Sequence, residues 1–145
     1  MNTVAQLLEA KPSGNTYTVN PTTTVYDALK LMSEKNIGAL VVTEGERVAG
    51  IFSERDYARK IILMGKSSRE TEVREIMTAN VFSIKSRQSI GECMSVMTDK
   101  HIRHLPVIDD GKLTGVISIG DVVKAIISEQ EDTIHHLEGY ITGKR

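Results

Sequence analysis

The sequence contains two copies of one pattern, and this repeat constrains the fold more than any other feature. Residues 16–61 align with residues 81–126 without a gap, so that each residue of the first copy matches the residue 65 positions later. Several pairs are identical: Met32 with Met97, Gly50 with Gly115, Ser53 with Ser118, and Asp56 with Asp121. Self-similarity at a fixed offset is typical of a structural unit that occurs more than once. We therefore expect two copies of one supersecondary unit.

Each copy has the pattern of a strand, a helix, a hairpin and a second helix. In the first copy, the short apolar run 17–19 predicts the strand, and Thr24 is the expected N-cap of a helix with apolar helical spacing over 25–32. Two apolar runs around a polar turn predict the hairpin within 39–52. The fold class expected is α/β: two pseudo-symmetric β-α-β-β-α repeats that pack sheet to sheet as one compact module and share a core.

The boundaries follow from the same alignment. With 145 residues the chain has the length of one ordinary domain, so we expect residues 1–145 to form a single module. Within it, repeat one spans 4–63, a linker and lead-in span 64–79, repeat two spans 80–128, and a helical tail spans 129–145. The tail carries Ile134, Leu137 and Ile141 on one helical face, which is expected to cap the core or to contact a second chain.

Composition excludes several classes of protein. Hydrophobic residues make up 40% and charged residues 26%, as in globular rather than disordered chains. The formal net charge of −1 gives no support to nucleic-acid or anionic-membrane binding, and no apolar run reaches the roughly 20 residues that span a bilayer. Cys93 is the only cysteine, and no signal peptide is recognised at the N-terminus. We expect a cytoplasmic location.

The candidate site lies where the second hairpin strand of each copy ends and a helix begins. Each copy has the motif Gly-x-x-Ser-x-x-Asp there, at 50–56 and 115–121. Helix-start amides favour an anion, a Ser hydroxyl can donate to a phosphate, and a carboxylate one turn later can accept from a ribose diol. A second interpretation stays open, because Ser-x-x-Asp also resembles a capping box, which needs no ligand.

Together with the stretch 102–109 and the lead-in 73–77, these motifs make the sequence resemble a tandem CBS domain pair, also called a Bateman module. The resemblance covers nearly the whole chain except the tail. The first copy departs from the family pattern at Val41, where proline is typical.

The resemblance implies two clefts between the repeats that bind an adenine ligand: AMP, ADP, ATP, NAD or S-adenosylmethionine. It implies that the ligand is regulatory. Because no His, Cys or acidic cluster has metal-ligand spacing and no titratable pair has a chemical task, we expect no metal, catalytic residue or catalytic cofactor. Asp56 and Asp121 would hold ribose, and Ser53 and Ser118 would contact phosphate. The other expected ligand-binding residues are Thr18 and Ser83 at the base; Gly38, Ala39, Arg103, His104, Leu105 and Pro106 at the hairpin entries; and Arg55, Arg103 and His104 as phosphate-binding charges.

The function that we expect is regulatory. The module would bind its ligand, form a homodimer and signal in trans to an unidentified effector protein. Two alternatives remain open: a dimerisation scaffold with vestigial clefts and, as the least expected, an enzyme. Because glycines at 120 and 38 stand opposite Arg55 and Arg103 in the alignment, the two clefts are expected to differ in affinity or in ligand.

Overall fold

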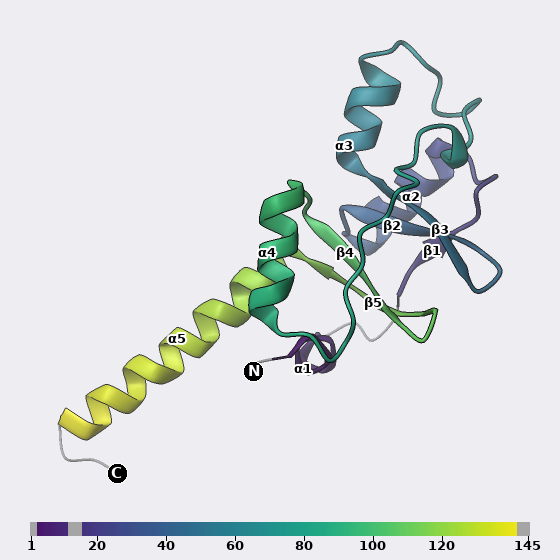
Figure 1. Ribbon diagram of the computed structural model, residues 1–145. Coiled ribbons are helices and arrows are strands. Elements are labelled where there is room, and N and C mark those ends of the chain that lie inside the picture. The colour runs from purple at the N-terminus through teal and green to yellow at the C-terminus, as the bar shows by residue number, and fades with distance from the viewer. Residues whose placement is uncertain (1–2, 12–15, 142–145) are drawn as a thin grey trace.

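A computed structural model describes residues 3–11 and 16–141 of the chain and contains the two expected α/β repeats (Figure 1). The elements of repeat one are β1 (Thr18–Val19), α2 (Val25–Lys35), β2 (Ala39–Glu44), β3 (Arg47–Ser53), α3 (Glu54–Tyr57) and the π-helix η1 (Ala58–Ile62). Those of repeat two are α4 (Ile90–Lys100), β4 (His104–Asp109), β5 (Lys112–Ser118) and α5 (Ile119–Ile141). A short helix precedes the first strand position of each repeat: α1 (Val4–Ala10) at the start of repeat one, and the 3-10 helix η2 (Val73–Glu75) in the lead-in to repeat two.

The two hairpins have the same register, which confirms the pseudo-symmetry. Strands β2 and β3 pair from Ala39 with Ser53, and β4 and β5 pair from His104 with Ser118, at the same offset of 65. Each hairpin also has an irregularity at the equivalent place, after Val42 and after Val107. The first strands differ in extent: β1 pairs in parallel with β2, whereas the strand predicted at 82–84 is a single bridge from Ile84 to Val107.

Local chemistry fixes both ends of the first helix in each repeat. The hydroxyl groups of Thr24 and Ser89 accept hydrogen bonds from the backbone amides three residues later, at 3.1 and 3.0 Å, as predicted for N-caps. Both helices end in the left-handed conformation, at Asn36 (φ 53°) and His101 (φ 54°). These ends turn the chain directly into the hairpin, so its entry residues lie at a defined place.

The buried apolar residues form two cores instead of the one shared core expected from the sequence. One cluster lies behind the sheet of repeat one and includes Leu40, Val42 and Phe52; the other lies behind the sheet of repeat two and includes Leu105, Val107 and Ile117. Side chains alternate between the faces of a strand, so Val41 and Pro106 lie on the opposite faces, where they are also buried. The repeats meet on these faces, and β3 contacts β5.

The two short helices exchange partners between the repeats. Val4 and Leu7 of α1, which precedes repeat one, are buried in the core of repeat two. Val73 and Ile76, which precede repeat two, are buried in the core of repeat one. Figure 1 shows α1, in purple, beside β5 and below α4. Each of these segments therefore completes the core of the other repeat, not of the repeat whose strands follow it directly in the chain.

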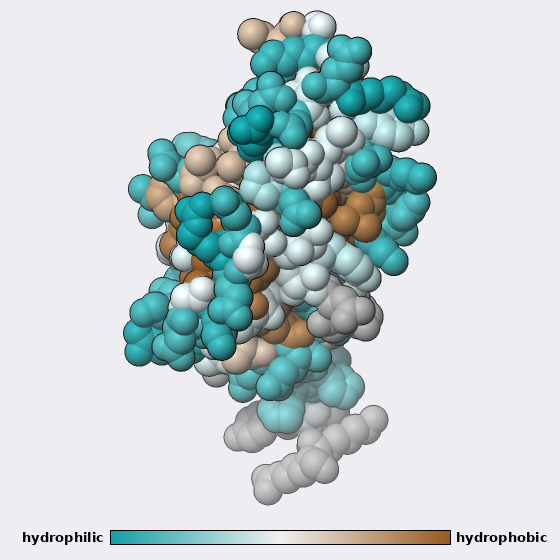
Figure 2. Space-filling view, turned by 90° about the vertical axis from the view of Figure 1, so that its right-hand side faces the viewer, coloured by the Kyte–Doolittle hydropathy of each residue, from teal (hydrophilic) through white to brown (hydrophobic). Residues whose placement is uncertain are grey.

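Helix α5 extends beyond the folded body of the molecule (Figure 1). Ile134 and Leu137 on it are 55% and 57% exposed, so they do not cap either core, and the side chain of Ile141 lies outside the described residues. Figure 2 shows a mostly hydrophilic face with separate apolar patches. Among the helices in the described part of the chain, none is long and apolar enough to cross a membrane.

Candidate functional site

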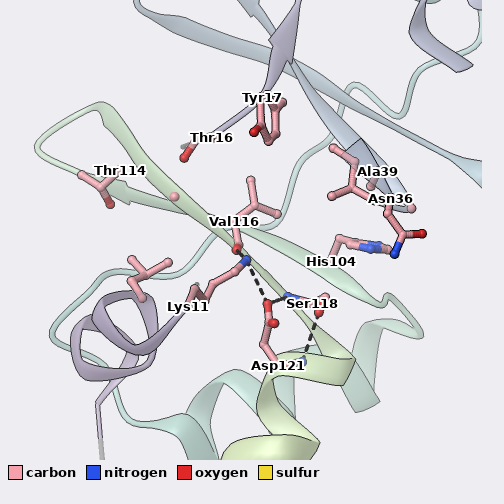
Figure 3. A pocket seen from close by; sticks show the side chains of 14 residues that line it. Lys11, Thr16, Tyr17, Asn36, Ala39, His104, Thr114, Val116, Ser118 and Asp121 are labelled. Atoms are coloured by element: carbon pink, nitrogen blue, oxygen red, sulfur yellow. Dashed lines mark hydrogen bonds and ion pairs between the residues drawn. The ribbon is translucent and has the colours of Figure 1, made fainter. Parts of the chain in front are cut away.

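Two clefts of about 370 and 380 Å³ lie between the repeats, and they are related by the pseudo-symmetry. We call them the Asp121 cleft and the Asp56 cleft after the acidic residue in each. The Asp121 cleft combines the start of α5 with Ile37, Gly38 and Ala39 at the hairpin entry of repeat one (Figure 3). The Asp56 cleft combines the start of α3 with the equivalent Ile102, Arg103 and His104 of repeat two. Each cleft thus needs both repeats.

Most of the expected ligand-binding residues line these clefts. Ala39, Ser118 and Asp121 line the first; Ser53, Arg55, Asp56 and Arg103 line the second; Gly38 and His104 line both. Four expected residues line neither cleft: Thr18, Ser83, Leu105 and Pro106.

The four exceptions have a structural reason. Thr18 and Ser83 are exposed, and Thr16 and Tyr17 line the Asp121 cleft instead (Figure 3). Leu105 follows His104 in β4, so its side chain points to the other face of the sheet, into the core of repeat two. Pro106 is buried and lines neither cleft, although Val116, its pairing partner on β5, lines the Asp121 cleft.

At the Asp121 cleft, the expected helix cap is present and an unexpected lysine joins it. The amide of Ser118 donates to Oδ2 of Asp121 at 2.9 Å, and the amide of Asp121 donates to Oγ of Ser118 at 3.1 Å. Lys11, the C-cap of α1, places its Nζ 3.1 Å from the same Oδ2 and donates to the carbonyl of Val116 at 2.8 Å (Figure 3). Sequence reasoning missed Lys11, because only the exchange of α1 to repeat two brings it here.

At the Asp56 cleft, both oxygens of the carboxylate are engaged. Ser53 donates to Oδ2 through its amide and its hydroxyl, at 2.9 and 3.1 Å. Thr78 Oγ1 and Lys60 Nζ both lie 3.4 Å from Oδ1, and Asp56 is only 7% exposed. Sequence reasoning also missed these two residues. The i,i+4 spacing of Asp56 and Lys60 on one helix is a signal that could have found Lys60.

His104 and Gly38 form a wall between the two clefts. A Cβ on Gly38 would lie 3.3 Å from Glu54 Oε1 and 3.5 Å from the His104 ring, so glycine permits this close approach. Burial lowers the pKa of His104; Asp121 opposes this effect, and Lys11 and Arg103 add to it. Without a ligand, His104 is therefore mainly neutral at pH 7 and can hydrogen-bond a ligand. Its expected role as a phosphate-binding charge stays a prediction.

The two clefts differ in their positively charged residues. Arg55 and Arg103 are both exposed there, and Arg55 Nη1 donates to the carbonyl of His101 at 3.0 Å. The Asp121 cleft has glycine at the two matching positions and Lys11 as its cation. Within residues 3–11 and 16–141, no group of three or more His, Cys, Asp or Glu side chains is placed to hold a metal ion.

Residues 5–63 and 73–128 each match the CBS domain. The mitochondrial CBS domain-containing protein CBSX3 of Arabidopsis thaliana is 46% identical over 125 residues, which cover 83% of this chain and 61% of that protein. The chain thus spans under two thirds of the length of this relative.

Two solved structures agree in fold. A protein with CBS domains from Burkholderia ambifaria MC40-6 is 56% identical, with a TM-score of 0.85 over 88% of this chain and 96% of the other. The hexameric CBS-CP12 protein from bloom-forming cyanobacteria is 27% identical, with a TM-score of 0.74 over 83% of this chain and 70% of the other. With two matched domains, the same architecture and relatives of this similarity, the chain belongs to the CBS-domain family and carries a pair of CBS domains.

Proposed function

We propose that this CBS pair is a regulatory module that binds an adenine nucleotide or dinucleotide in its clefts and signals in trans to an effector protein. Pairs of CBS domains generally serve as regulatory or signalling modules. The candidate ligands are AMP, ADP, ATP, NAD and S-adenosylmethionine. We propose no catalytic role for any residue.

One observation carries the proposal: each cleft joins a Ser–Asp helix start of one repeat to the hairpin entry of the other. At these helix starts the amides of Glu54 and Ile119 donate to the carbonyls of the opposite hairpin entry, and those of Asp56 and Asp121 donate to the Ser hydroxyls. A phosphate would therefore depend on the amides of Arg55 and Gly120, and the carboxylate can accept hydrogen bonds from ribose. The volumes of about 370 and 380 Å³ lie in the range of small-molecule sites. Since both repeats form each wall, a ligand that binds there changes how the repeats sit against each other.

We also propose a homodimer in the cytoplasm. The support for self-association is the apolar surface left on α5, and a structural neighbour is itself named as a hexamer. The support for the cytoplasm is a single cysteine, Cys93, which is buried and forms no internal disulfide. The Arabidopsis relative is named as mitochondrial, so a location in mitochondria is the alternative.

A thermal-shift panel tests the proposal. AMP, ADP, ATP, NAD, NADH and S-adenosylmethionine are each added to the wild type and to Asp56→Ala and Asp121→Ala. A ligand at about 100 times its Kd adds about 2.7 kcal/mol of stability, which raises Tm by roughly 5–10 °C for a chain of this size. We expect one ligand to give such a rise and one of the two variants to lose it.

The same experiment tests the scaffold alternative. If no ligand raises Tm at millimolar concentration, the Ser–Asp pairs act as helix caps alone, and the module is a dimerisation scaffold. Binding by isothermal titration calorimetry, run on the same ligands, checks that a missing shift reflects missing affinity.

A further inference from the structure

The two acidic residues that would hold ribose are not equally available. Asp56 accepts hydrogen bonds or ion pairs at both carboxylate oxygens and is nearly buried. The side chain of Asp121 is 24% exposed, and its contacts fall on Oδ2. Within the described part of the chain, no hydrogen bond or ion pair reaches Oδ1 of Asp121. This oxygen can accept a hydrogen bond from a ligand without breaking a contact of the protein.

Lys11 adds a donor beside this acceptor. An ammonium group has three hydrogens, so it can serve three acceptors. The Nζ of Lys11 donates to the carbonyl of Val116 at 2.8 Å and forms an ion pair with Oδ2 of Asp121 at 3.1 Å. A ligand can supply the third acceptor, and Lys11 lines the cleft with its side chain 30% exposed (Figure 3). The cleft therefore presents one charged donor and one charged acceptor next to each other.

A vicinal diol matches this pair. One hydroxyl can donate to Oδ1 of Asp121 while its neighbour accepts from Nζ of Lys11. We propose that Lys11 is a specificity-determining residue that hydrogen-bonds the ribose diol together with Asp121. This contact makes the Asp121 cleft selective for ribose and gives it a higher ligand affinity than the Asp56 cleft. This inference rests on the proposed function, because it concerns the same two clefts. It states which class of ligand they bind and which cleft is occupied first as the ligand concentration rises.

Among the described residues, the Asp56 cleft has no such pair. Lys60 of η1 lies four residues after Asp56 of α3, donates to the carbonyl of Ile76 at 2.9 Å and does not line the cleft. The cations that line it are Arg55, which donates to the carbonyl of His101 at 3.0 Å, and Arg103. A ribose at Asp56 would first have to displace Thr78 or Lys60, so we expect weaker binding there.

The test compares AMP with 2′-deoxy-AMP and 3′-deoxy-AMP by calorimetry, in the wild type and in Lys11→Met. A hydrogen bond to a charged group changes Kd by about tenfold or more. We expect the variant to bind AMP about tenfold more weakly at the tighter site. For the analogue that lacks the hydroxyl contacted by Lys11, Kd should be equal in wild type and variant, because the contact is already missing. Lys11→Arg, which keeps the charge and the donors, should restore part of the selectivity.

Two further controls make the outcome clear. Lys30→Met carries the same change on the exposed face of α2, outside both clefts, and should leave every Kd unchanged. Circular dichroism shows whether Lys11→Met is folded. An equal loss for AMP and both analogues, or no loss for AMP, overturns the role of Lys11 and leaves the proposed function standing. A wild type that does not bind AMP overturns this inference, and failure of the whole ligand panel overturns the proposed function with it.

Discussion

At the scale of single residues, two equivalent glycines mark where the exchanged helices approach the hairpins. A Cβ at Gly50 would lie 2.6 Å from Sδ of Met77 and 2.8 Å from the carbonyl oxygen of Thr78, which the amide of Ile51 holds at 3.0 Å. The three atoms nearest to a Cβ at Gly115 all belong to the side chain of Leu8, and the nearest is Cδ2 at 2.6 Å. We predict that Gly50→Ala lowers the free energy of unfolding by about 1–3 kcal/mol and that Gly115→Ala changes it by less than about 1 kcal/mol, because a leucine methyl can move and a held carbonyl cannot. Urea unfolding measures both, and equal losses would contradict the prediction.

His104 predicts how stability depends on pH. In the folded protein its pKa lies below the ordinary value of 6.5, mainly because it is buried, with Asp121, Lys11, Arg103 and Glu54 around it. When the pH falls below 6.5, the unfolded chain takes up a proton at this site before the folded protein does, so stability falls until the folded pKa is passed. We expect the urea concentration at the unfolding midpoint to fall as the pH is lowered from 8 to 5, and to fall less in His104→Gln than in the wild type. His135→Gln, on the exposed part of α5, should keep the wild-type dependence.

At the scale of elements, the exchange of α1 and η2 decides which repeat each lead-in stabilises. Leu7 is 3% exposed in the core of repeat two, although it precedes repeat one in sequence. We predict that Leu7→Ala costs about 2–5 kcal/mol, as buried leucines do. In the Leu7→Ala variant, hydrogen exchange should show that the amides of β4 and β5 lose protection before those of β2 and β3. The Ile76→Ala variant should show the reverse order, because Ile76 is buried in the core of repeat one. Equal loss in both hairpins would contradict the separate cores.

The sequence predicted the elements well because their signals are local. Apolar spacing, the caps Thr24 and Ser89, and the turns of both hairpins depend only on neighbouring residues. The exchange could not be predicted, because Val4 and Leu7 have the same apolar pattern as Val73 and Ile76, and this pattern does not say which core each segment joins. The same limit applies to the site. The Ser–Asp pairs are local and were predicted, whereas the contact of Lys11 with Asp121 depends on the exchange and was not.

At the scale of the whole molecule, α5 carries apolar surface that no other described part of the chain covers. Val123, Ile127, Ile134 and Leu137 are exposed and fall at the spacing of three, four and seven residues that places side chains on one helical face. A second copy of the chain presents the same face, so a two-fold pair would bury it twice. The expected homodimer therefore has a specific surface to test.

We predict that light scattering of the wild type at micromolar concentration gives twice the 16.0 kDa mass of the chain. The double variant Ile134→Lys, Leu137→Lys places two charges on the apolar face and should shift the mass towards the monomer, because each charge would be buried unpaired in the interface. His135→Lys with His136→Lys adds the same charge on the other side of the helix and should leave the dimer intact. A monomeric wild type would contradict the homodimer. A dimer that survives the Ile134 and Leu137 changes would place the interface elsewhere, and the exposed Ile62, Leu63 and Met64 at the end of η1 would be the next surface to change.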